Sequence, residues 1–177
     1  MSENTPLMKR AAALIAGRAH SRGELRRKLA APQKTEEAPK TEEIEAVLDR
    51  LEHLNLLNDA EYAYNFTFYR ISDLGWGEEK VRDALLDRDV AKAVVDRALR
   101  RVREESAPDG DPGGNVAVAL TEYVKGYCRK HGTPSSLKDA QKLARHLAGR
   151  GFDEDKIIGA LQRIIPPEIF RHFETGD

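Results

Sequence analysis

The sequence predicts an all-α protein built from three tandem three-helix repeats, similar to helix-turn-helix units and arranged as an elongated solenoid. Two observations lead to this prediction. Apolar residues recur at helical spacing, four residues and then three, in each third of the 177-residue chain. The second and third copies align at a constant offset of 62 residues, from Val81 to Leu143 and from Leu99 to Leu161.

The predicted organisation is a first unit at 5–54, a second at 55–105, a third at 115–166 and an apolar C-terminal tail at 167–177. The first copy lies 56 residues before the second at Leu25, but only 51 residues before it at Ile44. The difference is an insertion in the loop 31–40, which is bracketed by prolines. A second loop, at 106–115, is rich in Gly and Pro, so we expect it to be mobile.

Each unit contains three apolar patterns, one for each predicted helix. The first unit has Leu7, Ala11 and Leu14, then Leu25 and Leu29, then Ile44, Leu48 and Leu51. The second has Tyr62, Phe66 and Tyr69, then Val81 and Leu85, then Val95, Leu99 and Val102. The third has Leu120, Val124 and Tyr127, then Leu143 and Leu147, then Ile157, Leu161 and Ile164. Three short helices bury little apolar surface alone, so neighbouring units are expected to pack on one another.

The aromatic segment 58–77 fits two periods. Its aromatic residues at 62, 64, 66 and 68 alternate as in a strand. Tyr62, Phe66 and Tyr69 also share one face of a helix. The repeat favours the helix, and Asn58 with Glu61 supplies a start that resembles a capping box. We therefore expect these three aromatic residues to lie in the core, together with Trp76 at the start of the next helix.

Charge is distributed unevenly along the chain. Residues 1–30 carry seven Lys or Arg against two Glu, and residues 31–61 carry three against nine acids. Five cations form a basic N-terminal face: Arg18, Arg22, Arg26, Arg27 and Lys28. They could contact a phosphate backbone or an acidic protein groove, and a solvated helix face explains them equally well. Further candidates for partner contact are Tyr64, Phe68 and Arg70, since Tyr64 and Phe68 lie off the expected core face.

No pattern in the sequence indicates catalysis or a bound cofactor. There is no phosphate loop of the G-x-x-x-x-G-K-[ST] type, no G-x-G-x-x-G, and no nucleophile beside a base. Cys128-x-x-His131 is isolated, so we predict no metal site. The single cysteine excludes an internal disulfide, and no apolar run reaches the ~20 residues of a membrane span. We expect a non-enzymatic, cytoplasmic monomer.

Four short motifs, in this order, resemble those of the RecX family of bacterial regulatory proteins, which modulate the RecA recombinase. They are Ser21-x-x-Glu24-Leu25-x-x-Lys28-Leu29, Leu57-Asn58-Asp59-x-x-Tyr62-Ala63, Gly75-Trp76-Gly77 and Leu143-x-x-x-Leu147-x-x-x-Gly151-Phe152-Asp153. The resemblance covers residues 10–104 well and 116–166 more loosely. The chain departs from the family pattern in its longer loop 31–40, its extended linker 106–115, and a less basic helix after Gly77.

The resemblance implies a regulator that lodges in the helical groove of the RecA–DNA filament and restrains filament growth, ATP hydrolysis and strand exchange. It also implies roles in homologous recombination, DNA repair and the SOS response. The alternative is a DNA-binding protein of tandem helix-turn-helix-like units that uses the basic N-terminal face. The acidic third helix argues against this alternative, because a helix that faces phosphates should not carry Glu45, Asp49 and Glu52.

Overall fold

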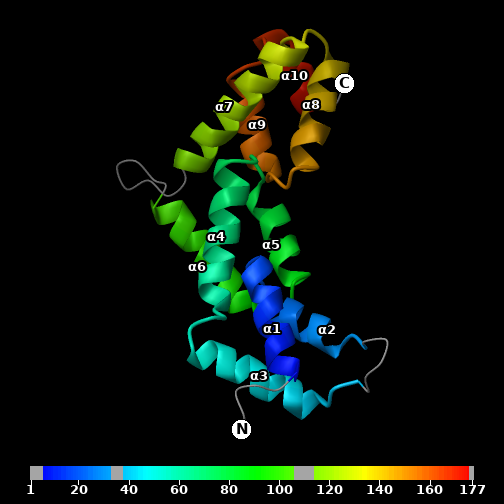
Figure 1. Ribbon diagram of the computed structural model, residues 1–177. Coiled ribbons are helices and arrows are strands. Elements are labelled where there is room, and N and C mark those ends of the chain that lie inside the picture. The colour runs from blue at the N-terminus through cyan, green and yellow to red at the C-terminus, as the bar shows by residue number, and fades with distance from the viewer. Residues whose placement is uncertain (1–5, 33–37, 106–113, 176–177) are drawn as a thin grey trace. The chain divides into compact units, whose positions relative to one another are not determined.

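The computed structural model describes residues 6–32, 38–105 and 114–175, and these ranges contain ten α-helices and no strand (Figure 1). The helices are α1 (Pro6–Gly17), α2 (Arg22–Ala30), α3 (Thr41–His53), α4 (Asp59–Ser72), α5 (Glu78–Leu86), α6 (Lys92–Glu105), α7 (Gly114–His131), α8 (Leu137–Ala148), α9 (Glu154–Gln162) and α10 (Pro167–Thr175). The predicted all-α class is confirmed. Most of the two predicted loops, at 33–37 and 106–113, lies outside the described residues.

The chain divides into two compact units. The first consists of Met1–Phe66 with Ala84–Ala98, and the second consists of Thr67–Asp83 with Leu99–Asp177. Helices α4, α5 and α6 therefore each contribute residues to both units. The division into three repeats stays a prediction.

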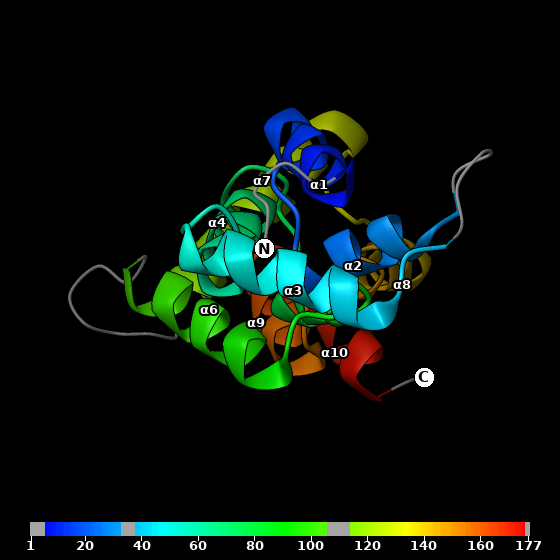
Figure 2. The same ribbon diagram turned by 60° about the horizontal axis from the view of Figure 1, so that its bottom comes forward.

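In the first unit, α1, α2 and α3 pack against one another, and Figure 2 shows α3 in the foreground with α1 and α2 behind it. Their shared core is completely closed to solvent at Ala11, Leu25, Leu29 and Leu48. Arg10 of α1 donates hydrogen bonds to the carbonyl oxygens of Lys28 (2.6 Å), Leu29 (3.2 Å) and Ala31 (3.0 Å). These bonds satisfy the carbonyls that the C-terminus of α2 leaves without helical partners.

In the second unit, α8 and α9 pack together, α7 lies against α9, and α10 covers both α8 and α9. The core is formed by Leu120, Val124, Leu143, Leu147 and Leu161, each at most 1% exposed. Residues 167–175 of the predicted C-terminal tail form α10, since proline is compatible with the first position of a helix. Phe170 is 7% exposed and anchors this last helix to the core.

Helix α4 buries a different face from the one that the aromatic pattern predicts. It begins as expected, because the Asn58 side chain accepts hydrogen bonds from the backbone N–H groups of Ala60 (3.0 Å) and Glu61 (3.1 Å). Its fully buried residues, however, are the small Ala63 and Thr67. Tyr69 is 51% exposed, so the expectation that it lies in the core is wrong.

The other predicted core positions divide into two groups. Leu25, Leu29, Val81 and Leu85 are completely buried. Tyr62, Phe66 and Trp76 are only half-buried, because the rings flank the stripe of small residues on α4 or stand at the start of α5.

Candidate partner-binding site

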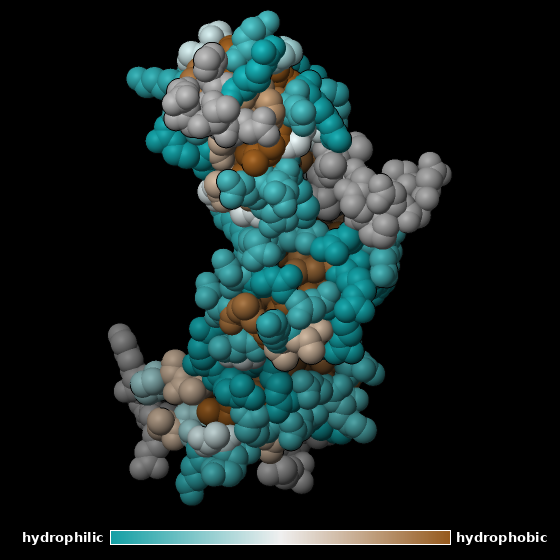
Figure 3. Space-filling model, turned by 180° about the vertical axis from the view of Figure 1, so that it is seen from behind, coloured by the Kyte–Doolittle hydropathy of each residue, from teal (hydrophilic) through white to brown (hydrophobic). Residues whose placement is uncertain are grey.

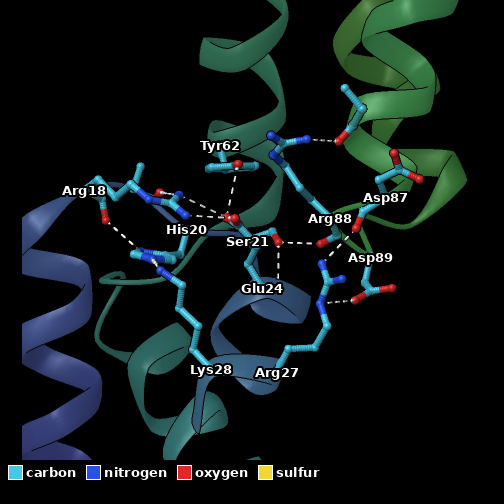
Figure 4. Close-up of polar contacts among 12 residues, drawn as sticks. Arg18, His20, Ser21, Glu24, Arg27, Lys28, Tyr62, Asp87, Arg88 and Asp89 are labelled. Carbon is cyan, nitrogen blue, oxygen red and sulfur yellow. Dashed lines mark hydrogen bonds and ion pairs between the residues drawn. The ribbon is translucent and has the colours of Figure 1, made fainter. Parts of the chain in front are cut away.

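The N-terminus of α2 is closed by side chains and backbone from distant parts of the first unit (Figure 4). Ser21 is the N-cap: its hydroxyl accepts a hydrogen bond from the backbone N–H of Glu24 (3.0 Å) and donates to the carbonyl of Arg88 (2.5 Å). Asp59 accepts a hydrogen bond from the backbone N–H of Arg22 at 2.7 Å. The first two motifs of the sequence therefore meet here and join α2 to α4.

Glu24 lies at the centre of this junction. Its carboxylate accepts two hydrogen bonds from Arg18, at 2.9 and 3.1 Å, and one from the Tyr62 hydroxyl at 3.4 Å. The bond from Arg18 lowers the pKa of Glu24, so the carboxylate stays ionised. Burial, and then the Glu24 charge, raises the pKa of Tyr62, which keeps its hydroxyl protonated as a donor.

The acidic face of α3 binds the arginines of α2. Arg22 contacts Glu45 (2.7 Å), Asp49 (2.6 Å) and Glu52 (2.5 Å), and Arg26 contacts Glu45 at 2.5 Å. Hydrogen bonds from Arg26 and then Arg22 lower the pKa of Glu45 to about 2. The two opposite charge runs that the sequence shows thus neutralise each other inside one unit.

The last two cations of the basic N-terminal face also have partners within the chain. Arg27 donates to the carbonyl of Asp87 (2.8 Å) and pairs with Asp89 (3.1 Å). The Lys28 ammonium lies 2.8 Å from Nε2 of His20. Because an ammonium only donates, this nitrogen accepts, and Nδ1–H donates to the carbonyl of Arg18 at 2.8 Å. Burial lowers the pKa of His20, which agrees with a neutral ring.

All five cations of the basic N-terminal face therefore take part in the packing of the first unit. Their role in partner binding stays a prediction, but each has a contact within its own chain that would have to be shared or broken.

In the second unit, the glycines of the last two motifs lie against each other. The backbone N–H of Gly77 donates to the carbonyl of Arg150 at 2.7 Å. A Cβ atom at Gly77 would stand 1.9 Å from the carbonyl oxygen of Gly151. Gly151 itself has a φ of +81° and lies against the backbone of Lys80. Only glycine fits at either position, and this explains why both motifs contain glycine there.

Trp76 stands beside this contact, between two cations. The Arg70 guanidinium carbon lies 4.6 Å from the ring centre, and the Lys80 ammonium lies 4.7 Å from it. On α4, one turn or less before Arg70, Phe68 is 45% and Tyr69 51% exposed. We call Phe68, Tyr69, Arg70, Trp76 and Lys80 the aromatic surface. Tyr64, another predicted contact residue, is half-buried.

A cavity of about 450 Å³ adjoins the aromatic surface. It is lined by Ile71, Ser72, Asp73, Leu74, Gly75, Trp76, Glu78, Glu122, Tyr123, Arg150 and Phe152. Arg150 closes one wall by donating to the carbonyl of Leu74 at 2.7 Å. Glu78, 8% exposed, is held by two hydrogen bonds from Arg103, at 2.5 and 3.2 Å. Glu78 is thus held in an ion pair within the second unit.

Within the described ranges, no three His, Cys, Asp or Glu side chains gather as metal ligands. Cys128 is half-buried, and burial raises the pKa of its thiol. No helix among the described residues is long and apolar enough to cross a membrane.

One group of exposed cations went unnoticed in the sequence. Lys138, Lys142 and Arg145 on α8 are spaced by four and then three residues, almost as regularly as the arginines of α2. The sequence contains this spacing, but residues 108–177 around it carry as many acidic as basic side chains, so no excess of charge marks it.

These observations define an all-helical protein in which residues of the sequence motifs meet at two places, Arg22 with Asp59 and Gly77 with Gly151, and which exposes the aromatic surface. No protein-family model matches the chain. It is 34% identical over 165 residues to "Regulatory protein RecX" of Ectopseudomonas mendocina (strain ymp), which covers 92% of this chain and 97% of that protein. It is 32% identical to the protein of that name from Prosthecochloris aestuarii (strain DSM 271 / SK 413), over 93% of this chain and 97% of the relative.

The chain therefore belongs to the RecX family of regulatory proteins. The crystal structure of RecX from Lactobacillus salivarius matches with a TM-score of 0.69 at 16% identity, over 88% of this chain and 92% of that one. A second RecX structure matches with a TM-score of 0.65 at 19% identity, over 85% of this chain and 67% of that one. At these sequence identities, the two structures show a shared fold and nothing about function.

Proposed function

We propose that this chain binds a RecA–DNA filament in its groove and inhibits filament growth, ATP hydrolysis and strand exchange. The support is its membership of the RecX family, whose relatives are named as regulatory proteins. It would act in the cytoplasm as a monomer, with no chemistry of its own.

One observation carries the choice of contact surface. Phe68 and Tyr69 are neighbouring large side chains that are 45% and 51% exposed, next to the guanidinium of Arg70. Aromatic residues and arginine are enriched where proteins bind one another, because rings bury much area for little loss of side-chain entropy and a guanidinium offers several hydrogen-bond donors. The face drawn in Figure 3 is mostly hydrophilic, with separate hydrophobic areas on it. We therefore place the RecA contact at the aromatic surface rather than at α2.

The test is DNA-dependent ATP hydrolysis by RecA on single-stranded DNA, with this protein added at substoichiometric ratios. We expect inhibition well below one copy per RecA protomer, since a few bound copies would disturb many protomers of a filament. The double variant Phe68→Ala/Tyr69→Ala should inhibit at least about tenfold less well, as expected for loss of central aromatic contacts.

The matched control is Leu54→Ala/Leu56→Ala, which removes two side chains of comparable exposure, 45% and 57%, from the first unit. It should inhibit like the unmodified chain. If the unmodified chain leaves ATP hydrolysis unchanged, the proposed function is wrong. If the aromatic variant inhibits as well as the control, the surface is wrong and the function stands.

The alternative, DNA binding through the basic N-terminal face, gains no observation in its favour. The carboxylates of α3 already hold Arg22 and Arg26, and phosphates would have to compete with them.

A further inference from the structure

The cavity beside the aromatic surface has a largely apolar lining within the second unit. Five of its lining residues are apolar or aromatic: Ile71, Leu74, Trp76, Tyr123 and Phe152. All five are half-buried. The volume of about 450 Å³ falls within the range of sites that hold small molecules, about 300–1,000 Å³. The cavity therefore suits a compact ligand with an apolar body.

Contacts within the second unit hold the walls of this cavity in place. Gly75, at a φ of +59°, turns the chain between α4 and α5, and a Cβ atom there would lie 3.0 Å from the Tyr123 ring. The Arg150 guanidinium lies over the same ring, 4.7 Å from its centre. Its Nη1 donates to the carbonyls of Leu74 at 2.7 Å and Gly75 at 3.5 Å. A site that is formed in advance costs less order when a ligand binds.

Only part of the Arg150 guanidinium is used by these contacts. A guanidinium carries five N–H donors, and both acceptors of Arg150 are bonded to Nη1. Its Nε and Nη2 have no acceptor among the residues that the structure describes. Two parallel N–H groups on one edge of a guanidinium match the two oxygens of a carboxylate. Arg150 thus offers an unused carboxylate-binding edge at the wall of the cavity.

The acids that line the cavity do little to oppose an anion. Glu78 is held by Arg103. Glu122 pairs with Lys125 at 2.7 Å. The remaining acid, Asp73, is exposed in the turn after α4, where water screens its charge. Two of the three carboxylates therefore already have a cation of their own.

Cations are in excess at the same place. Arg70 and Lys80 lie 4.6 and 4.7 Å from the centre of the Trp76 ring, and Arg150 lies on Tyr123. The two rings that would attract a cationic ligand therefore already carry cations, and such a ligand would meet three like charges. An anionic ligand would be attracted by the same three charges.

We propose that this cavity binds a small aromatic carboxylate, with the carboxylate on the Nε and Nη2 edge of Arg150 and the ring among Trp76, Tyr123 and Phe152. An aromatic body fits because three rings line the cavity and rings stack on one another with a gain beyond the area that they bury. The inference goes beyond the proposed function, concerns the chain alone and needs no RecA filament.

The first experiment uses Trp76, which lines the cavity and is the single tryptophan of the chain. The probe is hydrocinnamate, whose phenyl ring does not absorb at the red edge of tryptophan absorption. We expect a saturable change in the fluorescence of the full chain, with a Kd of about 1 mM or below. Hydrocinnamyl alcohol and phenylpropylamine have the same body without the carboxylate, and they should bind at least about tenfold more weakly. No binding of hydrocinnamate, equal binding of the three compounds, or tighter binding of the amine would overturn the proposal.

Arg150→Met tests the carboxylate contact. It should lower the affinity for hydrocinnamate by about tenfold or more and that for the alcohol by less than about threefold, so the preference for the carboxylate disappears. An equal loss for both compounds would mean that Arg150 only holds the cavity wall, and the carboxylate assignment would be wrong. The matched control is Arg163→Met, which removes an exposed cation of the same unit that does not line the cavity. Both affinities of this control should stay within about twofold of the unmodified chain.

A variant that fills the cavity tests its position and leaves Arg150 in place. Ser72 is exposed and lines the cavity, so Ser72→Phe should occupy the space and lower the affinity for hydrocinnamate at least about tenfold. Urea unfolding followed by circular dichroism gives a second readout that does not depend on Trp76. Hydrocinnamate at saturation should raise the urea midpoint of the unmodified chain and leave that of Ser72→Phe unchanged. An equal rise in both would place the ligand elsewhere on the chain and overturn the site.

Discussion

Gly77 offers the sharpest test of the junction between the two signature glycines. Replacing it by alanine would place a Cβ atom 1.9 Å from the carbonyl oxygen of Gly151, 2.1 Å from its carbonyl carbon and 2.4 Å from the nitrogen of Phe152. All three are backbone atoms, so no side chain can rotate away. Gly77 and the turn around Gly151 must separate by about 1.5 Å to reach the 3.4 Å of an ordinary contact.

The magnitude follows from what this separation breaks. The hydrogen bond from Gly77 N–H to the Arg150 carbonyl, now 2.7 Å, would be lost, at a net cost of about 1 kcal/mol. Forced displacement of packed backbone costs about 1–3 kcal/mol more. We therefore expect Gly77→Ala to lower the free energy of unfolding of the second unit by about 2–4 kcal/mol.

Urea unfolding provides the assay, followed by the fluorescence of Trp76, the single tryptophan of the chain, which is adjacent to the substitution. Circular dichroism reports the remaining helices. The control is Gly159→Ala within α9, where an added Cβ meets no atom of the described residues within 4 Å. It should raise stability by about 0.5–1 kcal/mol through helix propensity. A loss below about 0.5 kcal/mol for Gly77→Ala would refute the proposed close contact.

Three further predictions concern buried and charged groups. Arg22→Ala should lower the free energy of unfolding, measured in urea at low salt, by about 1–2 kcal/mol, because three partly exposed carboxylates lose the cation that they share. An unchanged free energy would mean that Arg22 contributes no more than a solvated surface residue. The pKa of Glu45 is depressed to about 2, so its stabilising contribution is complete above pH ~4.5 and is lost as the pH falls toward 2. Urea midpoints across that range should fall less steeply for Glu45→Gln than for the unmodified chain. Thr67→Val should raise stability by about 1 kcal/mol, since the buried hydroxyl has no hydrogen-bond partner among the residues that the structure describes; a comparable loss in urea unfolding would contradict this.

Helix content was predictable because apolar spacing is a local property. Leu25 and Leu29 are fully buried as their spacing suggests, and α4 starts at the cap that Asn58 provides. No helix was predicted for the C-terminal tail, although proline is common at the first position of a helix and Pro167 begins α10.

The buried face of α4 was not predictable from the size of its side chains. Large rings suggested a core of Tyr62, Phe66 and Tyr69, but the closest packing occurs where the side chains are small, at Ala63 and Thr67. A pattern search that favours large apolar residues passes over a stripe of alanine and threonine. Tyr69 is consequently left at the surface.

The partners of the cations in the basic N-terminal face could not be predicted, because they lie far away in the sequence. Arg22 reaches Glu52, 30 residues away, and Arg27 reaches Asp87, 60 residues away. A local sequence pattern does not predict which cation forms an ion pair with which acid. The acids of α3 at 45, 49 and 52 did supply a hint, since they repeat with nearly the same period as the arginines of α2.

The closure of the N-terminus of α2 also has a consequence for synthesis of the chain. Ser21 completes its hydrogen bonds only with Arg88, 67 residues later, and Gly23 is packed against Asp89. Helices α1 to α3 are synthesised before those residues. The start of α2 therefore stays open, and its glycine and serine uncovered, until about half of the chain has been translated. A chain truncated after α3 should consequently be cut by proteases near residue 21, whereas the full chain should resist them there.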